Sequence, residues 1–339
     1  MKILSLFDGM GCGYEALKRA GIPVTEYHAF EIDKYAIQIA KKNHPDIIHH
    51  GEINFMTDFS RFKGFDLLIG GSPCQSFSFA GNQLAFDDSR GKLFFEFIRA
   101  KDEIKPKYFL LENVKMKKEF LDVISEYMGV TPVLIDSALV SAQRRKRFYW
   151  CNWNVEQPED KGILLKDIIE DGIVDRAKSY CIDANYFKGG NPKNYFDKSR
   201  RQLIFIAAQR GRNIVDGKRC DYLGAPTEQR IEPNLSGKSN CLTTVQKDNL
   251  ICGGMADIKA HEQRRRVYSD EGKAPTLLTP TGGNYQTKVY YRNLTPIECE
   301  RLQTLSDRYT EGVSNTQRYK MIGNGWTIDV IAHIFKGIK

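Results

Sequence analysis

Cys74 stands where a buried strand is expected to end, in the stretch IGGSPCQSFSFAGNQ at residues 69–83. The apolar run FDLLIGG, residues 65–71, is typical of a buried strand that two glycines terminate. Pro73 fixes the backbone just before the cysteine. Ligands bind beyond the carboxyl ends of the strands in open parallel sheets, so Cys74 is a candidate nucleophile. A buried structural cysteine is the alternative that this stretch leaves open.

A glycine-rich loop and an acid form a second candidate group. The loop LFDGMGCG, residues 6–13, lies between an expected strand and an expected helix, and its glycines let the backbone approach a ligand closely. It lacks both the GxGxxG spacing of dinucleotide-binding loops and a phosphate-binding lysine. Glu31 ends the second expected strand, where a carboxylate can accept both ribose hydroxyls of an adenosine-type cofactor. Together these signals favour a nucleoside cofactor without phosphates, whereas Glu31 alone is equally typical of a surface residue.

A third candidate group ends another expected strand, FLLENV at residues 109–114. This strand places Glu112 and Asn113 at the same edge of the sheet as Cys74. A carboxyl group that burial keeps protonated there can serve as an acid.

The basic stretch SAQRRKRFYW, residues 141–150, follows later in the chain. On a strand, Arg145 and Arg147 point to one face, and Arg144 and Lys146 point to the other. A role in solubility alone is the alternative for this cluster.

The elements that must position these residues alternate between strand and helix over residues 1–153. This alternation predicts an α/β fold with a doubly wound, mostly parallel sheet. Residues 154–288 are rich in Gly, Asn, Pro and Thr and predict a smaller, loop-rich, β-leaning domain. Residues 289–339 return to an ordered pattern, in which Thr295, Pro296 and Glu298 predict the capped start of a helix.

Charge and cysteine content narrow the function classes. The chain of 339 residues has a net charge of +8, and residues 176–219 alone carry eleven Lys/Arg and three Asp/Glu. Such a basic block on an otherwise balanced chain is expected for a polyanionic partner, with a solvated face as the alternative. The eight cysteines include no CxxC pair, which argues against a disulfide framework and a zinc site. With no apparent signal peptide or membrane span, we expect a cytoplasmic protein without a metal.

Two similar segments lie in the variable middle region. GKSNCLTT at 237–244 and GKAPTLLT at 272–279 align without gaps and are consistent with two similar hairpins or with chance similarity.

Taken in order, the motifs resemble those of the DNA cytosine-C5 methyltransferases. FDGMGCG resembles the family's cofactor loop, SPCQSFS its nucleophile loop, and SRGKLFFEFIR, ENV and QRRKR the motifs that follow. RNLTPIECERLQ and GNGWTIDVI resemble its two closing motifs. The resemblance covers roughly residues 1–153 and 291–339, and it implies that 154–288 is the target-recognition domain. LFDG, GGSPC, KLFFEF and Trp326 resemble the animal de novo branch more than the bacterial, restriction-associated branch.

The resemblance implies a class I S-adenosylmethionine-dependent methyltransferase fold and methyl transfer to C5 of a flipped-out cytosine in double-stranded DNA. Cys74 would attack C6 as a thiolate and Glu112 would hold N3 protonated. Arg145 would fix the O2 of the base, and Arg147 would support the loop or a phosphate. We expect a monomer.

The same resemblance implies two sets of binding residues. The expected S-adenosylmethionine contacts are Phe7, Asp8, Gly9, Met10, Gly11, Cys12, Glu31, Ile32, Glu52, Ile53, Pro73, Leu93, Asn324 and Trp326. The expected DNA contacts are Gln75, Ser78, Asn113, Arg200, Arg201, Lys238 and Lys273.

Two positions depart from the family pattern. Glu52 stands where Asp is usual. Its side chain still ends in a carboxylate that could bind the adenine amino group, but it reaches one methylene further. Trp326 replaces the small apolar residue that is common in bacterial members and would tighten the cofactor pocket.

Two other functions compete with DNA methylation. The related transfer-RNA cytosine methyltransferases usually carry a Cys-Phe-Thr motif in the recognition region, and this chain has none. A catalytically inactive DNA-binding regulator would not be expected to retain Cys74, Glu112, Arg145 and a full cofactor loop.

Overall fold

The computed structural model describes residues 1–53, 56, 58–72, 92–172, 174–190, 195, 197–205, 209–215, 218–219, 227–231 and 291–338. The chain divides into two compact units. The first comprises Met1–Ile168, Lys178–Gly189 and Thr295–Lys339, and the second comprises Ile169–Ala177 and Gly190–Leu294. The domain boundaries expected after residues 153 and 288 stay predictions.

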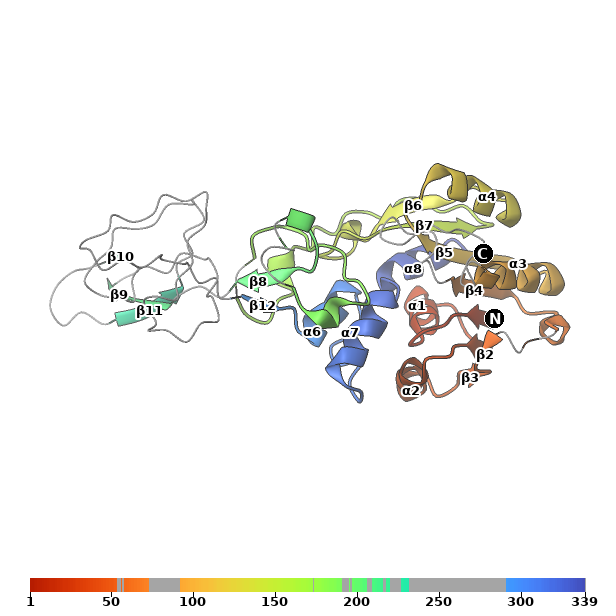
Figure 1. Cartoon of the computed structure of the whole chain (residues 1–339), viewed down its shortest axis with the longest axis horizontal. Coiled ribbons are helices and arrows are strands. Elements are labelled where there is room, and N and C mark those ends of the chain that lie inside the picture. The colour runs from red at the N-terminus through yellow and green to blue at the C-terminus, as the bar shows by residue number, and fades with distance from the viewer. Residues whose placement is uncertain are drawn as a thin grey trace, which may run out of the picture. The chain divides into compact units, whose positions relative to one another are not determined.

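A seven-stranded sheet organises the first unit (Figure 1). Its strands are β1 (Lys2–Leu6), β2 (Glu26–Phe30), β3 (Ile48–His49), β4 (Leu67–Gly71), β5 (Tyr108–Val114), β6 (Val133–Asp136) and β7 (Lys146–Cys151). They lie in the order β3-β2-β1-β4-β5-β7-β6. The neighbours from β3 to β5 are parallel, and β7 is antiparallel to both β5 and β6. The expected doubly wound, mostly parallel sheet is confirmed.

Helices connect and cover these strands. They are α1 (Cys12–Ala20), α2 (Lys34–Asn43), α3 (Lys92–Ile104), α4 (Lys118–Met128), α6 (Pro296–Leu302), α7 (Asn315–Asn324) and α8 (Ile328–Phe335). The last helix, α8, packs against α1, where Arg19 Nη1 lies 2.9 Å from Asp329 Oδ1. The C-terminal segment therefore completes the unit that the N-terminal strands begin.

The alternation of side chains along the strands supplies a core on each face of the sheet. On one face, Leu4 and Leu6 join a buried cluster with Phe94 and Phe97 of α3. On the other face α1 comes very close to the sheet. A Cβ atom on Gly13 would lie 2.5 Å from Ile69 Cδ1 and 2.7 Å from the Tyr27 hydroxyl.

The ends of the helices follow the sequence pattern. Gly21 ends α1 in the left-handed conformation, with φ of 73°. Thr295 Oγ1 accepts a hydrogen bond from the Glu298 amide, and the Glu298 carboxylate accepts one from the Thr295 amide. The predicted capping box at the start of α6 is therefore confirmed.

The described part of the second unit contains short antiparallel strands. β8 (Leu203–Phe205) pairs with β12 (Tyr291–Asn293), and β9 (Gln209–Val215) pairs with β10 (Lys218–Arg219) and β11 (Thr227–Ile231). The repeated segments at 237–244 and 272–279 lie outside the described residues.

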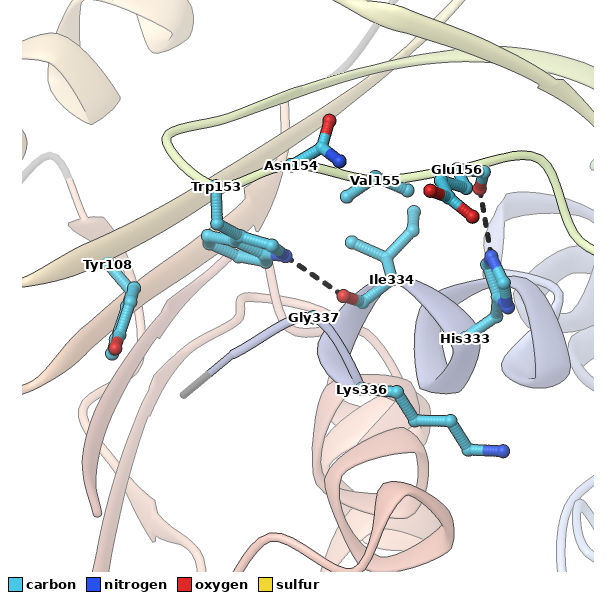
Figure 2. A pocket seen from close by; sticks show the side chains of 9 residues that line it. All are labelled: Tyr108, Trp153, Asn154, Val155, Glu156, His333, Ile334, Lys336 and Gly337. Carbon is cyan, nitrogen blue, oxygen red and sulfur yellow. Dashed lines mark hydrogen bonds between the residues drawn. The ribbon is translucent and has the colours of Figure 1, made fainter.

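A cavity of about 620 Å³ lies beside the first residue of β5 (Figure 2). Tyr108 and Trp153 line it beside the end of α8, and Trp153 Nε1 donates to the Ile334 carbonyl at 2.9 Å. It lies at the opposite end of β5 from Glu112, and none of the residues expected to bind cofactor or DNA lines it.

Two kinds of feature are absent from the described residues. No described helix has the length and apolar character needed to cross a membrane. No group of three or more His, Cys, Asp or Glu side chains in this part of the chain is placed to hold a metal ion.

Candidate active site

The candidate site lies at the carboxyl ends of β1, β2, β4 and β5. β1 and β4 are neighbours, and the chain leaves them toward opposite sides of the sheet, which is the place where α/β sheets bind ligands. β1 leads into the glycine loop, and β4 ends at Gly71, just before Ser72. The expected site residues Pro73, Cys74, Gln75 and Ser78 lie outside the described residues.

The glycine loop is tightly turned. Gly9 and Gly11 have φ of 64° and 83°, which glycine adopts without steric cost. Phe7 also has a positive φ, of 60°, and a side chain with a Cβ atom is strained there. The surrounding structure must therefore hold the chain in this sharp turn directly after β1.

Asp8 carries an unused acceptor in this loop. Ser5 Oγ and the Tyr27 hydroxyl both donate to its Oδ1, each at 2.6 Å. Its Oδ2 is buried and has no hydrogen-bond partner among the described residues. Burial raises the pKa of Asp8 to about 6, against the opposing effect of the two hydroxyl donors. An unpaired buried carboxyl oxygen is costly, so the loop fits a ligand that brings a donor or a positive charge.

Glu31 is fixed to the same loop. Its Oε2 accepts from the Gly9 amide at 2.8 Å, and its Oε1 accepts from the Ile32 and Asp33 amides, both at 2.8 Å. The next side chain, Ile32, is 70% exposed. An anchored carboxylate beside an exposed apolar side chain fits the ribose and base of an adenosine.

The other expected cofactor residues divide by burial. Met10, Cys12 and Ile53 are buried, and Ile53 belongs to the same core cluster as Phe94. Glu52, Leu93 and Trp326 are half-buried, whereas Asn324 is exposed at the end of α7. A Cβ atom on Gly325 would lie 2.9 Å from Met10 Cε and 3.4 Å from Cys12 Sγ, so the segment after α7 closes on the glycine loop.

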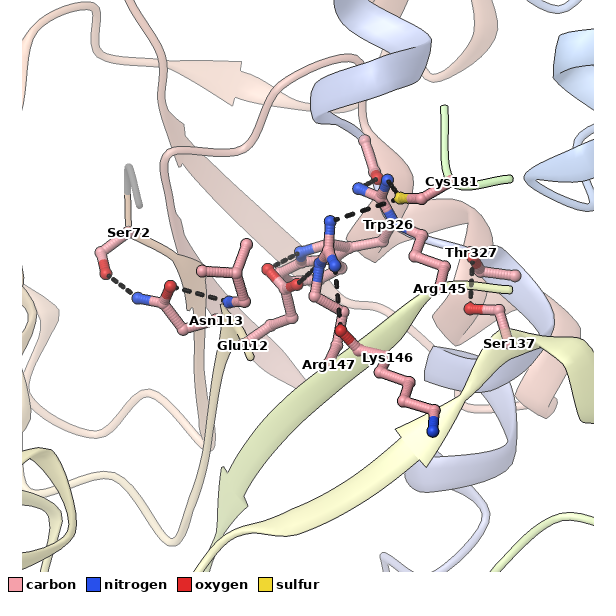
Figure 3. Close-up of polar contacts among 12 residues, drawn as sticks. Ser72, Glu112, Asn113, Ser137, Arg145, Lys146, Arg147, Cys181, Trp326 and Thr327 are labelled. Carbon is pink, nitrogen blue, oxygen red and sulfur yellow. Dashed lines mark hydrogen bonds and ion pairs between the residues drawn. The ribbon is translucent and has the colours of Figure 1, made fainter. Parts of the chain in front are cut away.

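Glu112 is the centre of a polar cluster at the end of β5 (Figure 3). Its Oε1 lies 3.0 Å from Arg147 Nε of β7, and its Oε2 accepts from Trp326 Nε1 at 3.1 Å. The side chains of Glu112 and Arg147 are only 12% and 15% exposed. The structure thus joins three residues that the sequence analysis singled out separately.

Arg145 is committed to the protein framework. Its Nη1 donates to the Ile182 carbonyl at 2.9 Å, and its Nη2 donates to the carbonyls of Gly323 and Gly325 at 3.1 and 2.9 Å. The side chain is buried. The O2 atom of a cytosine would have to compete with these carbonyl groups for the Arg145 guanidinium. The sequence did not indicate that Arg145 has these partners.

Cys181 is a site residue that sequence reasoning missed. Its Sγ lies 3.3 Å from Arg145 Nη1 and 4.0 Å from Arg147 Nη2 (Figure 3). Burial alone would raise the pKa of this thiol, but the two guanidinium groups outweigh burial and lower it below its ordinary value. No local motif around Cys181 signals this position, because the contact depends on how the chain folds after β7.

The Asn113 side chain points toward Ser72. Its Nδ2 donates to Ser72 Oγ at 3.1 Å, and its Oδ1 accepts from the Val114 amide at 2.8 Å. The side chain is buried. Asn113 therefore ties the end of β5 to the residue that follows β4.

The basic block at 176–219 contains residues with structural partners. Lys178 Nζ donates to three carbonyl groups, those of Ala138, Ser141 and Ile163, at 2.6 to 3.0 Å. Arg176 Nε lies 3.2 Å from Asp175 Oδ1 and donates to the Tyr195 hydroxyl at 2.9 Å. Part of the positive charge is thus used inside the fold.

The expected DNA contacts in this region are only partly described. Arg200 is exposed and Arg201 is half-buried with a positive φ of 58°. Lys238 and Lys273 lie outside the described residues.

The order and direction of the strands are those of the class I S-adenosylmethionine-dependent methyltransferase fold. Solved structures of similar fold include the Dnmt2 methyltransferase of S. pombe, with a TM-score of 0.58 and 14% identity over 99% of this chain and 97% of that chain. Another is a DNMT2 variant of Spodoptera frugiperda, with a TM-score of 0.58 and 18% identity over 99% of this chain and 98% of that chain.

Sequence comparison then identifies the family. The chain matches the C-5 cytosine-specific DNA methylase family over residues 1–339, and it belongs to that family. It is 29% identical to the type II methyltransferase M.HhaI of Haemophilus parahaemolyticus, over 98% of this chain and 93% of the relative. It is 27% identical to the orphan methyltransferase M.SPRI of Bacillus phage SPR, over 99% of this chain and 97% of the relative. The protein is a DNA cytosine-5 methyltransferase, and S-adenosylmethionine is its methyl donor.

Proposed function

We propose that this enzyme methylates a cytosine flipped out of double-stranded DNA, with Cys74 as the nucleophile and Glu112 as the acid. The observation that carries the proposal is the Glu112–Arg147–Trp326 cluster at the strand ends of a chain that matches the family throughout. Inside a duplex the ring atoms of cytosine are out of reach, so the base must leave the stack.

The chemistry requires a temporary loss of aromaticity in the base. The thiolate of Cys74 attacks C6, forming a carbon–sulfur bond and making C5 nucleophilic. Glu112 donates a hydrogen bond or a proton at N3, where negative charge develops. When bound, S-adenosylmethionine supplies an electrophilic methyl group for C5. Loss of the C5 proton to a base and departure of the thiolate then restore the ring.

Arg147 is a better candidate than Arg145 for contact with the base or its phosphate. The guanidinium of Arg145 already donates to three main-chain carbonyl groups, whereas that of Arg147 faces Glu112 and Cys181. We infer that Arg147 stays at the site and turns toward the base when DNA enters, while Arg145 holds the framework. This revises the roles expected from the sequence.

Asn113 acts as a positioning residue. Its hydrogen bond to Ser72 holds the end of β4 two residues before Cys74. A nucleophile must approach within about 3–3.5 Å of the reacting carbon, so the start of its loop has to be well placed.

Four residues of the first unit are suited to hold S-adenosylmethionine. The free oxygen of Asp8 suits its ammonium group, the anchored Glu31 suits its ribose, and exposed Ile32 suits its adenine. Trp326, fixed by Glu112, would close the pocket over the methyl group.

We assign target recognition to the region of the second unit, with 154–288 as the predicted domain. Arg200, Arg201, Lys238 and Lys273 are its proposed DNA contacts, the first two mainly to phosphates. A monomeric enzyme in the cytoplasm remains the expectation.

The test is covalent trapping on DNA that carries 5-fluorocytosine. Fluorine cannot leave C5 as the proton does, so the wild type should accumulate a protein–DNA adduct and Cys74→Ser should form none. A transfer RNA with the same modified base serves as the competing substrate. An adduct on RNA but not on DNA, or an adduct that survives in Cys74→Ser, would contradict the proposal.

A further inference from the structure

A hydrogen-bond network of polar side chains lies between two segments that are expected to contact S-adenosylmethionine. One segment is Glu31, which directly follows β2, and the other is Glu52 and Ile53, which follow β3. Between them, His28 of β2 meets His50, two residues before Glu52. We propose, resting on the proposed cofactor site, that His50 is a positioning residue that sets the segment 50–53 for S-adenosylmethionine.

The hydrogen bonds of this network all donate in the same direction, from Arg61 toward Glu26. Arg61 Nη2 lies 3.0 Å from His50 Nδ1, and a guanidinium can only donate. His50 must then carry its proton on Nε2, which donates to His28 Nδ1 at 2.7 Å. His28 in turn donates from Nε2 to the Glu26 carboxylate at 2.8 Å. Both imidazoles are therefore neutral, and each has one assigned tautomer.

Ring packing holds His50 in the same place. The ring stacks on that of Phe30 with centroids 5.1 Å apart. It lies within 13° of parallel to the His28 ring with centroids 4.9 Å apart, as expected for two rings joined edge to edge by the hydrogen bond between them. Phe62 meets it edge-on at 5.6 Å, and the His50 amide donates to the Ala29 carbonyl at 2.9 Å. Because Phe30 directly precedes Glu31, His50 connects the two halves of the adenosine site through one rigid contact.

Protonation of His50 would break the hydrogen-bond network. A second proton would remove the acceptor that Arg61 uses and would place two positive charges side by side. The groups that face His50 are Arg61, His28 and His49, with Glu26 beyond His28 and Lys2 beyond Glu26. Burial and these neighbours lower the pKa of His50 to about 4, so the network is intact at neutral pH.

The neighbouring His49 supplies a matched control. Both of its ring nitrogens are buried and have no hydrogen-bond partner in the part of the chain that the structure describes. His49 is adjacent to His50 in sequence, but it takes no part in the hydrogen-bond network that links Arg61 to Glu26. Replacing it tests the general effect of altering β3.

The experiment measures S-adenosylmethionine binding by calorimetry in four variants. His50→Phe keeps the stacking ring and removes both nitrogens, so its Kd should rise about three- to tenfold, as for the loss of one or two hydrogen bonds. His28→Phe should have the same effect, and the double variant should be no worse than either. His49→Phe should bind as the wild type does.

Further measurements separate positioning from general damage. DNA affinity and kcat at saturating cofactor should stay at wild-type values, and His50→Gln should recover part of the affinity. Arg61→Gln alters the exposed end of the hydrogen-bond network and should also weaken cofactor binding. It provides the test if His50→Phe fails to fold. Unchanged affinity in both His50→Phe and Arg61→Gln, or equal loss in His49→Phe, overturns the inference. Absence of cofactor binding by the wild type would instead refute the proposed cofactor site.

Discussion

At the residue scale, Cys181 makes a testable contrast with the other described cysteines. Arg145 and Arg147 lower the pKa of its thiol, whereas burial raises the pKa of Cys12 to about 12 and that of Cys151 to about 11. Since the thiolate is the reactive form, iodoacetamide at pH 7 should alkylate Cys181 well before Cys12 or Cys151 in a Cys74→Ser background. Peptide mass spectrometry at timed intervals measures the order.

The arginine beside Cys181 provides the control for that order. Arg147→Gln removes one positive charge from the thiol and should slow alkylation of Cys181 without changing that of Cys151. Equal rates at Cys181 and Cys12 in the parent protein would show that the guanidinium groups do not activate the thiol.

Asp8 predicts a pH dependence of stability. Its pKa is about 6 in the folded protein and about 4 when unfolded, so the folded state retains the proton longer. Stability from this group is therefore full below pH 4 and is lost as the pH rises to 6, by about 3 kcal/mol in all. The side chain of Asp8→Asn cannot titrate. The unfolding free energy of this variant, relative to that of the wild type, should therefore rise by the same amount between pH 4 and 7. Chemical denaturation at several pH values checks this, and parallel pH profiles would contradict it.

The residue scale also shows where sequence reasoning stops. Alternation along a strand correctly places Arg145 and Arg147 on one side, since both approach Cys181. It does not say how far each side chain reaches or what it meets. The partners of Arg145 lie 37, 178 and 180 residues away in the chain, and only the folded protein brings them together.

At the scale of elements, two helix starts offer a matched comparison. The Thr295 side chain caps α6 through a capping box, whereas Ser314 at the start of α7 makes no capping hydrogen bond with its side chain. Thr295→Ala should therefore lower the unfolding free energy by about 1 kcal/mol, and Ser314→Ala should lower it by much less. Thermal or urea unfolding of both variants measures the difference, and equal losses would remove the capping box from the explanation.

The elements were the most predictable level of the fold. Strand and helix positions in the first unit follow from local patterns such as the apolar run before Gly70, the left-handed Gly21 and the Thr295–Glu298 box. The close approach of α7 to residues 183–184 was not predictable. A Cβ atom on Gly323 would lie 2.3 to 2.5 Å from that backbone, and no local feature of the sequence announces a contact so distant in the chain.

At the scale of the whole molecule, the net charge of +8 predicts how DNA binding responds to salt. If Arg200 and Arg201 contact phosphates, neutralising both should weaken binding to target and non-target duplexes alike. The slope of log affinity against log salt should flatten by roughly 0.9 for each lost contact. Filter binding or anisotropy at several salt concentrations gives the slopes.

Lys178 belongs to the same basic block and serves as the contrast. It donates to three carbonyl groups inside the first unit, so Lys178→Met should lower stability and leave the salt slope unchanged. A salt slope that changes in Lys178→Met but not when Arg200 and Arg201 are neutralised would show that this pair does not contact the DNA phosphates.

The packing of α8 on α1 has a consequence for synthesis of the protein. Arg19 and Asp329 meet across that interface although 310 residues separate them. At about 5–20 residues per second, a ribosome needs roughly 15 to 60 s to produce the second after the first. During that interval the face of α1 that packs against α8 in the folded protein lacks its partner helix. The nascent chain therefore exposes apolar surface for most of its translation. The yield of folded protein should depend on chaperones that bind such surfaces.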